Sequence, residues 1–285
     1  MPPRAEVRRA FRWAGVTVVA AAETAAPLAR AGRFLALDSR PSTVVPAITL
    51  YRAGRGHRLE GPFRPIATES PGDTLYALVE ALAHVFASRA RRPVLHAAAL
   101  AIEGGAVLCL GAPWAGKSHL AFAALARGWR VIGDDRAVLD PKSGRIEAFP
   151  KCLKLRLSGG LPAGAGVLVG AGDAAIGAIG EDRRLIVSRA NEGFVPYGVT
   201  HPLRAAVVIE RGAPGGIGRI ARAEALARLL DGARGGAPMT LIRALRRVHP
   251  TAELPLLRIA PGEPEAALDR LIALVRGREA VAASR

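Results

Sequence analysis

The segment LGAPWAGKSHL, residues 110–120, contains residue types that can hold a phosphate group. Gly111, Gly116, Lys117 and Ser118 match the pattern G-x-x-x-x-G-K-[ST]. The two glycines allow a loop to wrap a phosphate with its N–H groups directed inward. The lysine supplies a positive charge to the terminal phosphates, and the serine hydroxyl coordinates a magnesium ion. A strand must precede this motif and a helix must follow it, and the apolar segments AVLCL and SHLAFAALARG predict both.

Two residues inside this loop are unusual for a phosphate-binding turn. Pro113 has no N–H to donate, although its fixed φ can stiffen the turn. Trp114 could cover the phosphates or an incoming substrate, or its ring could pack against the protein. Packing is the favoured interpretation, because tryptophan most often buries its ring. The residues expected to contact the nucleotide are Gly111, Ala112, Pro113, Trp114, Ala115, Gly116, Lys117, Ser118 and His119.

A pair of carboxylates follows the next predicted strand, in the segment IGDDR. Asp134 and Asp135 would lie on the phosphate side, because the carboxyl ends of strands cluster there in an open α/β sheet. One carboxylate can then orient the metal or its waters while the other accepts a hydroxyl proton. The alternative is a simple turn at the strand end, with Arg136 paired to one aspartate.

His96 lies in the apolar segment PVLHAAAL, on the strand expected before the loop strand. A lone histidine in an apolar segment is more often a core residue than a catalytic one. The residues alone therefore favour a packing role for His96.

The run VLHAAALAIEGGAVLCLGAPWAGKSHLAFAALARGWRVIGDDRAVL resembles the catalytic domain of the HPr kinase/phosphorylase family and its HPr-kinase-related relatives. The matched features are a histidine strand, the phosphate loop and RG-x-x-x-x-x-DD-R, over about residues 90–140, with weaker similarity to about residue 276. The resemblance implies a fold akin to phosphoenolpyruvate carboxykinase and an ATP-dependent kinase that uses Mg²⁺ and acts on a serine hydroxyl of a peptide or small protein. By position, the resemblance implies that Ser118 and Asp134 hold the metal and that Lys117 stabilises the charge of the transferring phosphate. It also implies that Asp135 accepts the proton and that His96 lies near the phosphates.

This sequence also departs from the family pattern. The family carries a glutamate metal ligand in an E-x-R-G-x-G segment, whereas the comparable segment KLRLSGG has no acidic residue, which argues against phosphorolysis. The later catalytic arginine of the family has only candidate counterparts, at Arg183, Arg184 and Arg204. The strand KCLKLRL alternates leucines with Cys152, Lys154 and Arg156, so its second face is basic and could bind phosphates or an acidic substrate, or be solvated.

Three functions are compatible with these features. The leading hypothesis is a kinase that transfers the γ-phosphate of ATP to a serine-type hydroxyl of a peptide or small protein, such as a ribosomally made biosynthetic precursor peptide. The alternatives are a small-metabolite kinase of the same fold and a non-catalytic ATP-binding regulatory module. ATP and the peptide are the expected partners, and a homo-oligomer is compatible with the sequence.

The predicted strands and helices that hold these residues indicate an α/β fold with a mixed central sheet over residues 91–285. The resemblance implies that this fold is of the HPr kinase type. Residues 1–90 are expected to form a small α+β region with a substrate-binding or regulatory role. It would contain short strands over 33–66, with a turn at Gly54–Gly56. A helix from Ser70 to Phe86, capped by Asp73 or Thr74, would follow. Further strands are predicted at 94–104, 106–111, 129–133, 154–157, 184–188, 205–210 and 254–259. Further helices are predicted at 117–127 with Gly128 as its cap, and at 222–232, 238–248 and 263–276.

Composition limits the class of protein. The net charge of +16 could attract polyanions, but no basic block is interleaved with aromatics, and aromatics make up only 5% of the chain, so we expect neither nucleic acid nor membrane as a partner. The apolar run after the first basic residues is interrupted by Glu23 and is too short to cross a bilayer. Cys109 and Cys152 cannot form a disulfide framework and are expected to be buried free thiols of a cytoplasmic protein.

Overall fold

The computed structural model describes residues 7–157, 160–212, 216–230, 237–248, 253–259 and 263–277. The chain divides into two compact units, one of Met1–Ala90 with Pro150–Glu192, the other of Arg91–Phe149 with Gly193–Arg285. The boundary after Ala90 coincides with the one expected from the sequence. Residues 150–192, in contrast, group with the N-terminal region and not with the region that contains the phosphate loop.

The first unit is built on a six-stranded sheet of order β3-β1-β2-β4-β5-β6. Two of its connections are tight hairpins. In the first, Ala14 and Gly15 both have positive φ, as a two-residue turn of the right twist requires; in the second, Gly54 has positive φ where the sequence predicts a turn. The strands are β1 (Val7–Trp13), β2 (Val16–Ala22), β3 (Ser39–Pro41), β4 (Ile48–Ala53), β5 (Gly56–Gly61) and β6 (Phe63–Thr68).

A helix occupies part of the region expected to be short strands. Helix α1 (Ala25–Leu35) includes Arg33–Leu35, the start of the segment RFLALD that was expected to be extended. Its buried residues Leu28, Ala31 and Leu35 recur every three or four positions, which is the helical period. The short strand expectation was therefore wrong here because the periodic run begins before residue 33.

Helix α2 (Pro71–Arg89) is the long helix predicted from the sequence. Its N-cap is Ser70, which replaces the expected Asp73 or Thr74. Ser70 accepts a hydrogen bond from the Asp73 N–H, and the Asp73 carboxylate accepts one from the Ser70 N–H, so the two form a capping box. The predicted apolar face is buried: Leu75, Leu78, Val79, Leu82 and Phe86.

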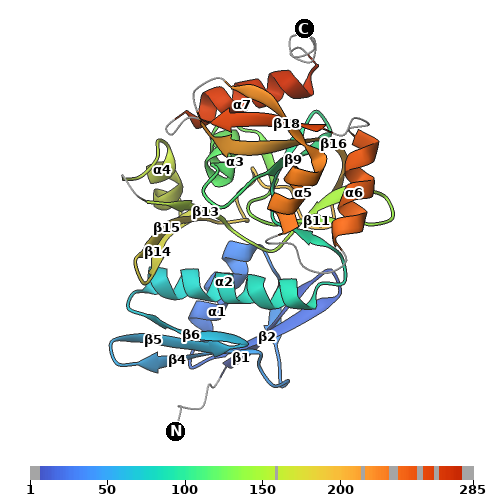
Figure 1. Cartoon of the computed structure of the whole chain (residues 1–285). Coiled ribbons are helices and arrows are strands. Elements are labelled where there is room, and N and C mark those ends of the chain that lie inside the picture. The colour runs from blue at the N-terminus through green and yellow to red at the C-terminus, as the bar shows by residue number, and fades with distance from the viewer. Residues whose placement is uncertain are drawn as a thin grey trace. The chain divides into compact units, whose positions relative to one another are not determined.

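A second, three-stranded sheet explains why residues 150–192 belong to the first unit. Its order is β13-β15-β14, with β13 (Leu153–Arg156), β14 (Ala174–Ile179) and β15 (Asp182–Val187), and α4 (Ala165–Gly170) precedes β14. It packs on α2, which lies between the two sheets in Figure 1. The backbones meet closely, since a Cβ on Gly72 would lie 2.0 Å from the carbonyl oxygen of Ile176.

The second unit has a nine-stranded mixed sheet, so the α/β class with a mixed central sheet is confirmed. The main path is β10-β8-β9-β16-β12-β11-β7, and β18 joins β16 in parallel while β17 pairs with β18. The sequence did not predict β11, β12 or β17. The strands are β7 (Val94–Leu95), β8 (Ala98–Ile102), β9 (Gly105–Leu110), β10 (Arg130–Gly133), β11 (Ala137–Leu139), β12 (Arg145–Ala148), β16 (Thr200–Arg211), β17 (Ile217–Ala221) and β18 (Glu253–Ile259).

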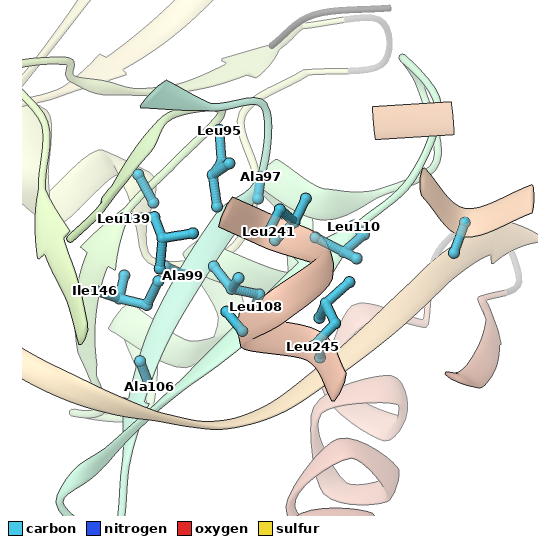
Figure 2. Close-up of a cluster of buried hydrophobic side chains, with 14 of the residues drawn as sticks. Leu95, Ala97, Ala99, Ala106, Leu108, Leu110, Leu139, Ile146, Leu241 and Leu245 are labelled. Carbon is cyan, nitrogen blue, oxygen red and sulfur yellow. The ribbon is translucent and has the colours of Figure 1, made fainter. Parts of the chain in front are cut away.

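Helices pack on both faces of this sheet (Figure 1). Leu108 and Leu110 of β9 point into an apolar cluster with Leu241 and Leu245 of α6, as Figure 2 shows. Because side chains alternate along a strand, Cys109 faces the other way, towards the side of α3. The helices are α3 (Lys117–Ala126), α5 (Arg222–Leu230), α6 (Ala237–Val248) and α7 (Pro264–Val275); residues 231–232 of the helix expected at 222–232 lie outside the described residues.

Two further expectations can be compared with this structure. Cys109 and Cys152 are both free and buried, and burial raises the pKa of each thiol to about 12. In the described part of the chain, every helix is too short or too polar to cross a membrane.

Candidate phosphate-binding site

Three segments that carry candidate residues reach the same edge of the sheet of the second unit. Strand β8 is antiparallel to both β9 and β10, so β9 and β10 run in the same direction. The register pairs Ala98 with Cys109 and Ala99 with Gly133. The start of β8 therefore lies beside the ends of β9 and β10. The same edge of the sheet thus holds the residues before β8, the loop after β9 and the aspartates after β10.

In the loop between β9 and α3, both glycines of the motif stand where a side chain would be unfavourable. Gly111 has φ +155°, and a Cβ there would lie 2.4 Å from the carbonyl oxygen of Ile209 on β16. Gly116 has φ +105° and is the N-cap of α3. Both glycines are thus required by geometry, the first by close packing and the second by its left-handed conformation.

Trp114 has an unfavourable backbone conformation and an exposed surface. Its φ is +73°, a region that bulky residues rarely adopt, and 55% of the residue is exposed. The interpretation of Trp114 as a packed ring is therefore wrong. The turn itself brings Trp114 to the surface: the Ala115 N–H donates to the Ala112 carbonyl across it, and Ala115 is buried.

Lys117 lies at the centre of the loop. Its ammonium donates to the carbonyl oxygens of Gly111 at 2.7 Å and Ala112 at 2.9 Å, and the residue is only 6% exposed. Burial lowers the pKa of the ammonium, and the charges of Asp135 and Asp134 oppose this shift. Both carboxylates therefore lie near enough to act electrostatically on the lysine.

The first turn of α3 adds the other groups of the motif. Ser118 is half-buried and His119 is exposed, and α3 is a ten-residue helix whose N-terminal N–H groups begin at the loop. Anions are favoured at such a helix end because unpaired N–H groups and the helix dipole meet there. Phosphate binding is the chemistry that these residues suit.

The two aspartates are held by a strained turn. The Arg136 N–H donates to the Asp134 carbonyl at 2.7 Å, which closes a three-residue turn around Asp135 with φ +62°. A γ-turn with positive φ at its centre is rare and strained. Gly133 packs against the same turn, since a Cβ there would lie 2.4 Å from the Arg136 carbonyl oxygen. The sequence G-D-D-R is thus adapted to one backbone shape.

The turn separates the two carboxylates by environment. Asp134 is 1% exposed, whereas the Asp135 side chain is 27% exposed and its Oδ1 lies 2.8 Å from Nδ1 of His96. His96 sits between β7 and β8, outside either strand, and its side chain is 23% exposed. Within the described residues, its Nε2 is buried and has no hydrogen-bond partner. His96 is therefore paired with the candidate site, and the placement of its imidazole on a regular core strand was wrong.

Arg136 does not form the ion pair that the simple-turn alternative required. Its guanidinium lies over the Phe149 ring, 5.7 Å from the centroid, and no ion pair joins it to either aspartate among the residues described. The aspartates are consequently not neutralised by their neighbour in the sequence.

The candidate counterparts of the later arginine belong to different parts of the chain. Arg204 packs against Gly105 at the beginning of β9, which is the edge opposite the loop. Arg183 and Arg184 belong to the first unit, where Arg184 donates to Asp182 at 2.8 Å. Arg204 is therefore not the catalytic arginine of the loop edge.

The basic face of β13 is also accounted for within the first unit. Lys154 lies 2.9 Å from the Glu80 carboxylate of α2, and Arg156 lies 3.0 Å from Asp182. Both cations are thus ion-paired, and the solvated-edge and phosphate-binding interpretations of this face give way to a structural one.

Two properties of the site had no signal in the sequence. The pairing of His96 with Asp135 joins residues that are far apart in the chain, and the strain at Asp135 depends on the turn.

No group of three or more histidine, cysteine, aspartate or glutamate side chains with metal-binding geometry occurs in the described ranges.

Comparisons with known proteins add little to this geometry. No protein-family model matches the sequence, and no curated protein matches it. Solved structures that resemble the chain include the Hpr(Ser) kinase/phosphatase from Coxiella burnetii, with 16% sequence identity and a TM-score of 0.33. That match covers 66% of this chain and 95% of the other.

Proposed function

We propose that the protein is an ATP-dependent kinase that transfers the γ-phosphate to a serine-type hydroxyl of a peptide or small protein. The observation that carries the proposal is the His96–Asp135 pair at the same sheet edge as the phosphate loop. A nucleotide-binding module needs the loop alone, whereas transfer to a hydroxyl also needs a carboxylate that can take the proton.

The chain's residues divide the reaction between them. Lys117 would leave the two carbonyls that it now contacts. Together with the N–H groups of the loop, it would then hold the β- and γ-phosphates. The oxygen of the substrate hydroxyl would bond to the γ-phosphorus while the bond from that phosphorus to the leaving oxygen of ADP breaks. Asp135 would accept the proton that the hydroxyl loses. His96 would donate from Nδ1 to Asp135, which orients the carboxylate.

The residues present are suited to Mg²⁺ bound together with a nucleotide. This ion prefers oxygen ligands and usually has one or two protein ligands beside substrate phosphates and water, so a dedicated cluster of side chains is not required. Ser118 and buried Asp134 supply a hydroxyl and a carboxylate at the loop edge and would hold the ion. When bound, the ion would neutralise charge on the phosphates.

The test uses the full chain with γ-labelled ATP and Mg²⁺, together with peptides encoded beside its gene. We expect label on a serine of one peptide and loss of that label in Asp135→Asn, which keeps the size of the side chain and tolerates the left-handed backbone. Binding of a fluorescent ATP analogue should be unchanged in this variant. The matched control is Asp269→Asn, because Asp269 is an exposed carboxylate that pairs with Arg127 at the far end of α3.

The alternatives give different results in the same experiment. Transfer to a small hydroxylated metabolite and to no peptide would favour the small-metabolite kinase. Nucleotide binding without transfer to any acceptor would favour the regulatory module. Equal labelling by wild type and Asp135→Asn would contradict the role of Asp135.

A further inference from the structure

The open face of the six-stranded sheet in the first unit contains a basic hollow of about 490 Å³. This volume is in the range of about 300–1,000 Å³ that is typical of ligand sites. The lining residues are Ala10, Arg12, Thr17, Val19, Arg40, Pro41, Ser42, Val44, Val45, Ala47 and Arg89.

The strand register explains why the hollow is basic. Arg12 pairs with Thr17 across β1 and β2, and Arg40 of β3 pairs with Ala10. Directly paired residues, and residues two apart on one strand, share a face of the sheet. Arg12 and Arg40 are therefore on one face, while Trp13 is on the other face and meets Phe86 of α2 edge to face.

Arg89 supplies a third positive charge at this face. It is at the end of α2, and its guanidinium donates to the Thr17 carbonyl at 3.1 Å. All three arginines are exposed, and none of the described residues that line the hollow is acidic. Within the described residues, Arg12 and Arg40 make no ion pair, so their charges are available to an anionic ligand.

A fastened loop forms the apolar rim of the hollow. Residues 42–47 are tied to the sheet at both ends, by the Ser42 N–H to the Arg8 carbonyl at 3.1 Å and the Ala47 N–H to the Val19 carbonyl at 2.8 Å. Between these ends, Val44 and Val45 are 62% and 81% exposed. Two adjacent valines held in solvent beside three arginines offer apolar and charged contacts to one ligand.

We infer that this hollow binds an acidic peptide segment, with its carboxylates on the arginines and an apolar side chain on Val44 and Val45. Arginine pairs well with carboxylates because its N–H groups match their geometry, and clusters of arginines recognise acidic motifs. Single-stranded nucleic acid suits the hollow less well, since its lining, as far as the structure describes it, has no aromatic side chain for base stacking. The inference builds on the proposed function, for which it supplies a docking site for the peptide substrate outside the phosphate loop.

The test measures binding of a short fluorescein-labelled peptide of aspartates and glutamates with one central leucine, by anisotropy, to the full chain without ATP. The double variant Arg12→Glu/Arg40→Glu should weaken binding about tenfold or more, because two attractions become repulsions. The control Arg55→Glu/Arg64→Glu makes the same change in net charge at two exposed arginines elsewhere on the same sheet, in the turn after β4 and on β6, and should change binding less than about twofold. Replacing the leucine of the peptide with serine should also weaken binding, and added salt should weaken it further.

Two outcomes would overturn the inference. Equal losses in Arg12→Glu/Arg40→Glu and in Arg55→Glu/Arg64→Glu would mean that net charge alone attracts the peptide. A labelled oligothymidine that binds more tightly than the peptide and is equally sensitive to Arg12→Glu/Arg40→Glu would assign the hollow to nucleic acid. Binding of a fluorescent ATP analogue is measured on the same variants, so a folded chain that binds the peptide but not ATP would contradict the proposed function and leave the hollow intact.

Discussion

Each unit of the molecule buries a lysine among carboxylates, but the two surroundings differ. In the first unit, Lys151 and Lys154 lie 3.4 Å and 2.9 Å from the Glu80 carboxylate. In the second unit, Lys117 donates instead to two backbone carbonyls, although Asp134 and Asp135 act on its charge. In the first arrangement the lysines contact a carboxylate directly, and in the second the ammonium is hydrogen-bonded to neutral carbonyl oxygens.

This difference indicates which cluster is suited to a ligand. A lysine held by neutral carbonyls can turn to a phosphate without breaking an ion pair, whereas separating Glu80 from its lysines would leave a buried charge uncompensated. The second unit also holds Asp135 in a strained turn, and strained backbone is concentrated at functional sites. The three predictions below test this contrast, from the largest expected effect to the smallest.

Replacing Lys117 with methionine should reduce phosphotransfer by about 100-fold or more, because a buried positive charge at the phosphates is lost. The fold should persist, since methionine fills a similar volume and removes a buried charge. Labelled-ATP transfer and thermal unfolding measure the two effects. Lys142→Met is the control, because Lys142 is exposed on the turn between β11 and β12; equal loss of transfer in both variants would contradict the role of Lys117.

Replacing Glu80 with glutamine should destabilise the protein by about 2 kcal/mol, because Lys151 and Lys154 lose the charge of the carboxylate that they contact. The expected value is below the roughly 3–5 kcal/mol of a fully buried pair, since the Glu80 side chain is 23% exposed. Urea unfolding followed by circular dichroism measures it.

The control for this prediction is Glu60→Gln, which removes an exposed pair with Arg58 and should cost at most about 1 kcal/mol. Equal midpoints for the two variants would show that the Glu80 cluster is not a structural ion pair.

Asp135→Ala should be less stable than Asp135→Gly by about 1 kcal/mol, because alanine has a Cβ that is unfavourable at φ +62° and glycine has none. Both variants lose the carboxylate, so the difference isolates the backbone. The same pair of substitutions at Arg64 on strand β6 should give the opposite order, since glycine weakens a regular strand. If the two Asp135 variants had equal free energies of unfolding, the turn would relax on substitution and strain would not be stored there.

Local features of the fold were predictable because their signals are close together in the sequence. The glycine-containing loop before α3 and the helix itself depend on residue types within one short segment, and the burial of α2 follows from its apolar period. The C-cap of α3 is Arg127, and Gly128, which was predicted as the cap, is the next residue and has positive φ. Strands β11, β12 and β17 were missed because they are short or lie in segments without clear alternation. Helix α1 was missed in part because RFLALD is apolar enough to suit either element.

The candidate site was only half predictable, and the reason is distance along the chain. Lys117 and Asp135 were identifiable by motif and by strand order. That His96 donates to Asp135, and that the Asp135 turn is strained, depends on the antiparallel placement of β8 between β9 and β10. The sequence pattern left the neighbours of His96 undefined.

The sequence by itself determined a loop able to wrap phosphates, a helix to follow it and two carboxylates after the next strand, because these properties belong to residue types and short spacings. The tertiary structure alone decided which charges meet. It paired Lys154 with Glu80 and Arg156 with Asp182, held Lys117 on backbone carbonyls and, among the residues that the structure describes, left Arg12 and Arg40 of the hollow without ion pairs. The physical reason is that an ionic contact depends on distance and burial in space, and strand register and helix packing set both.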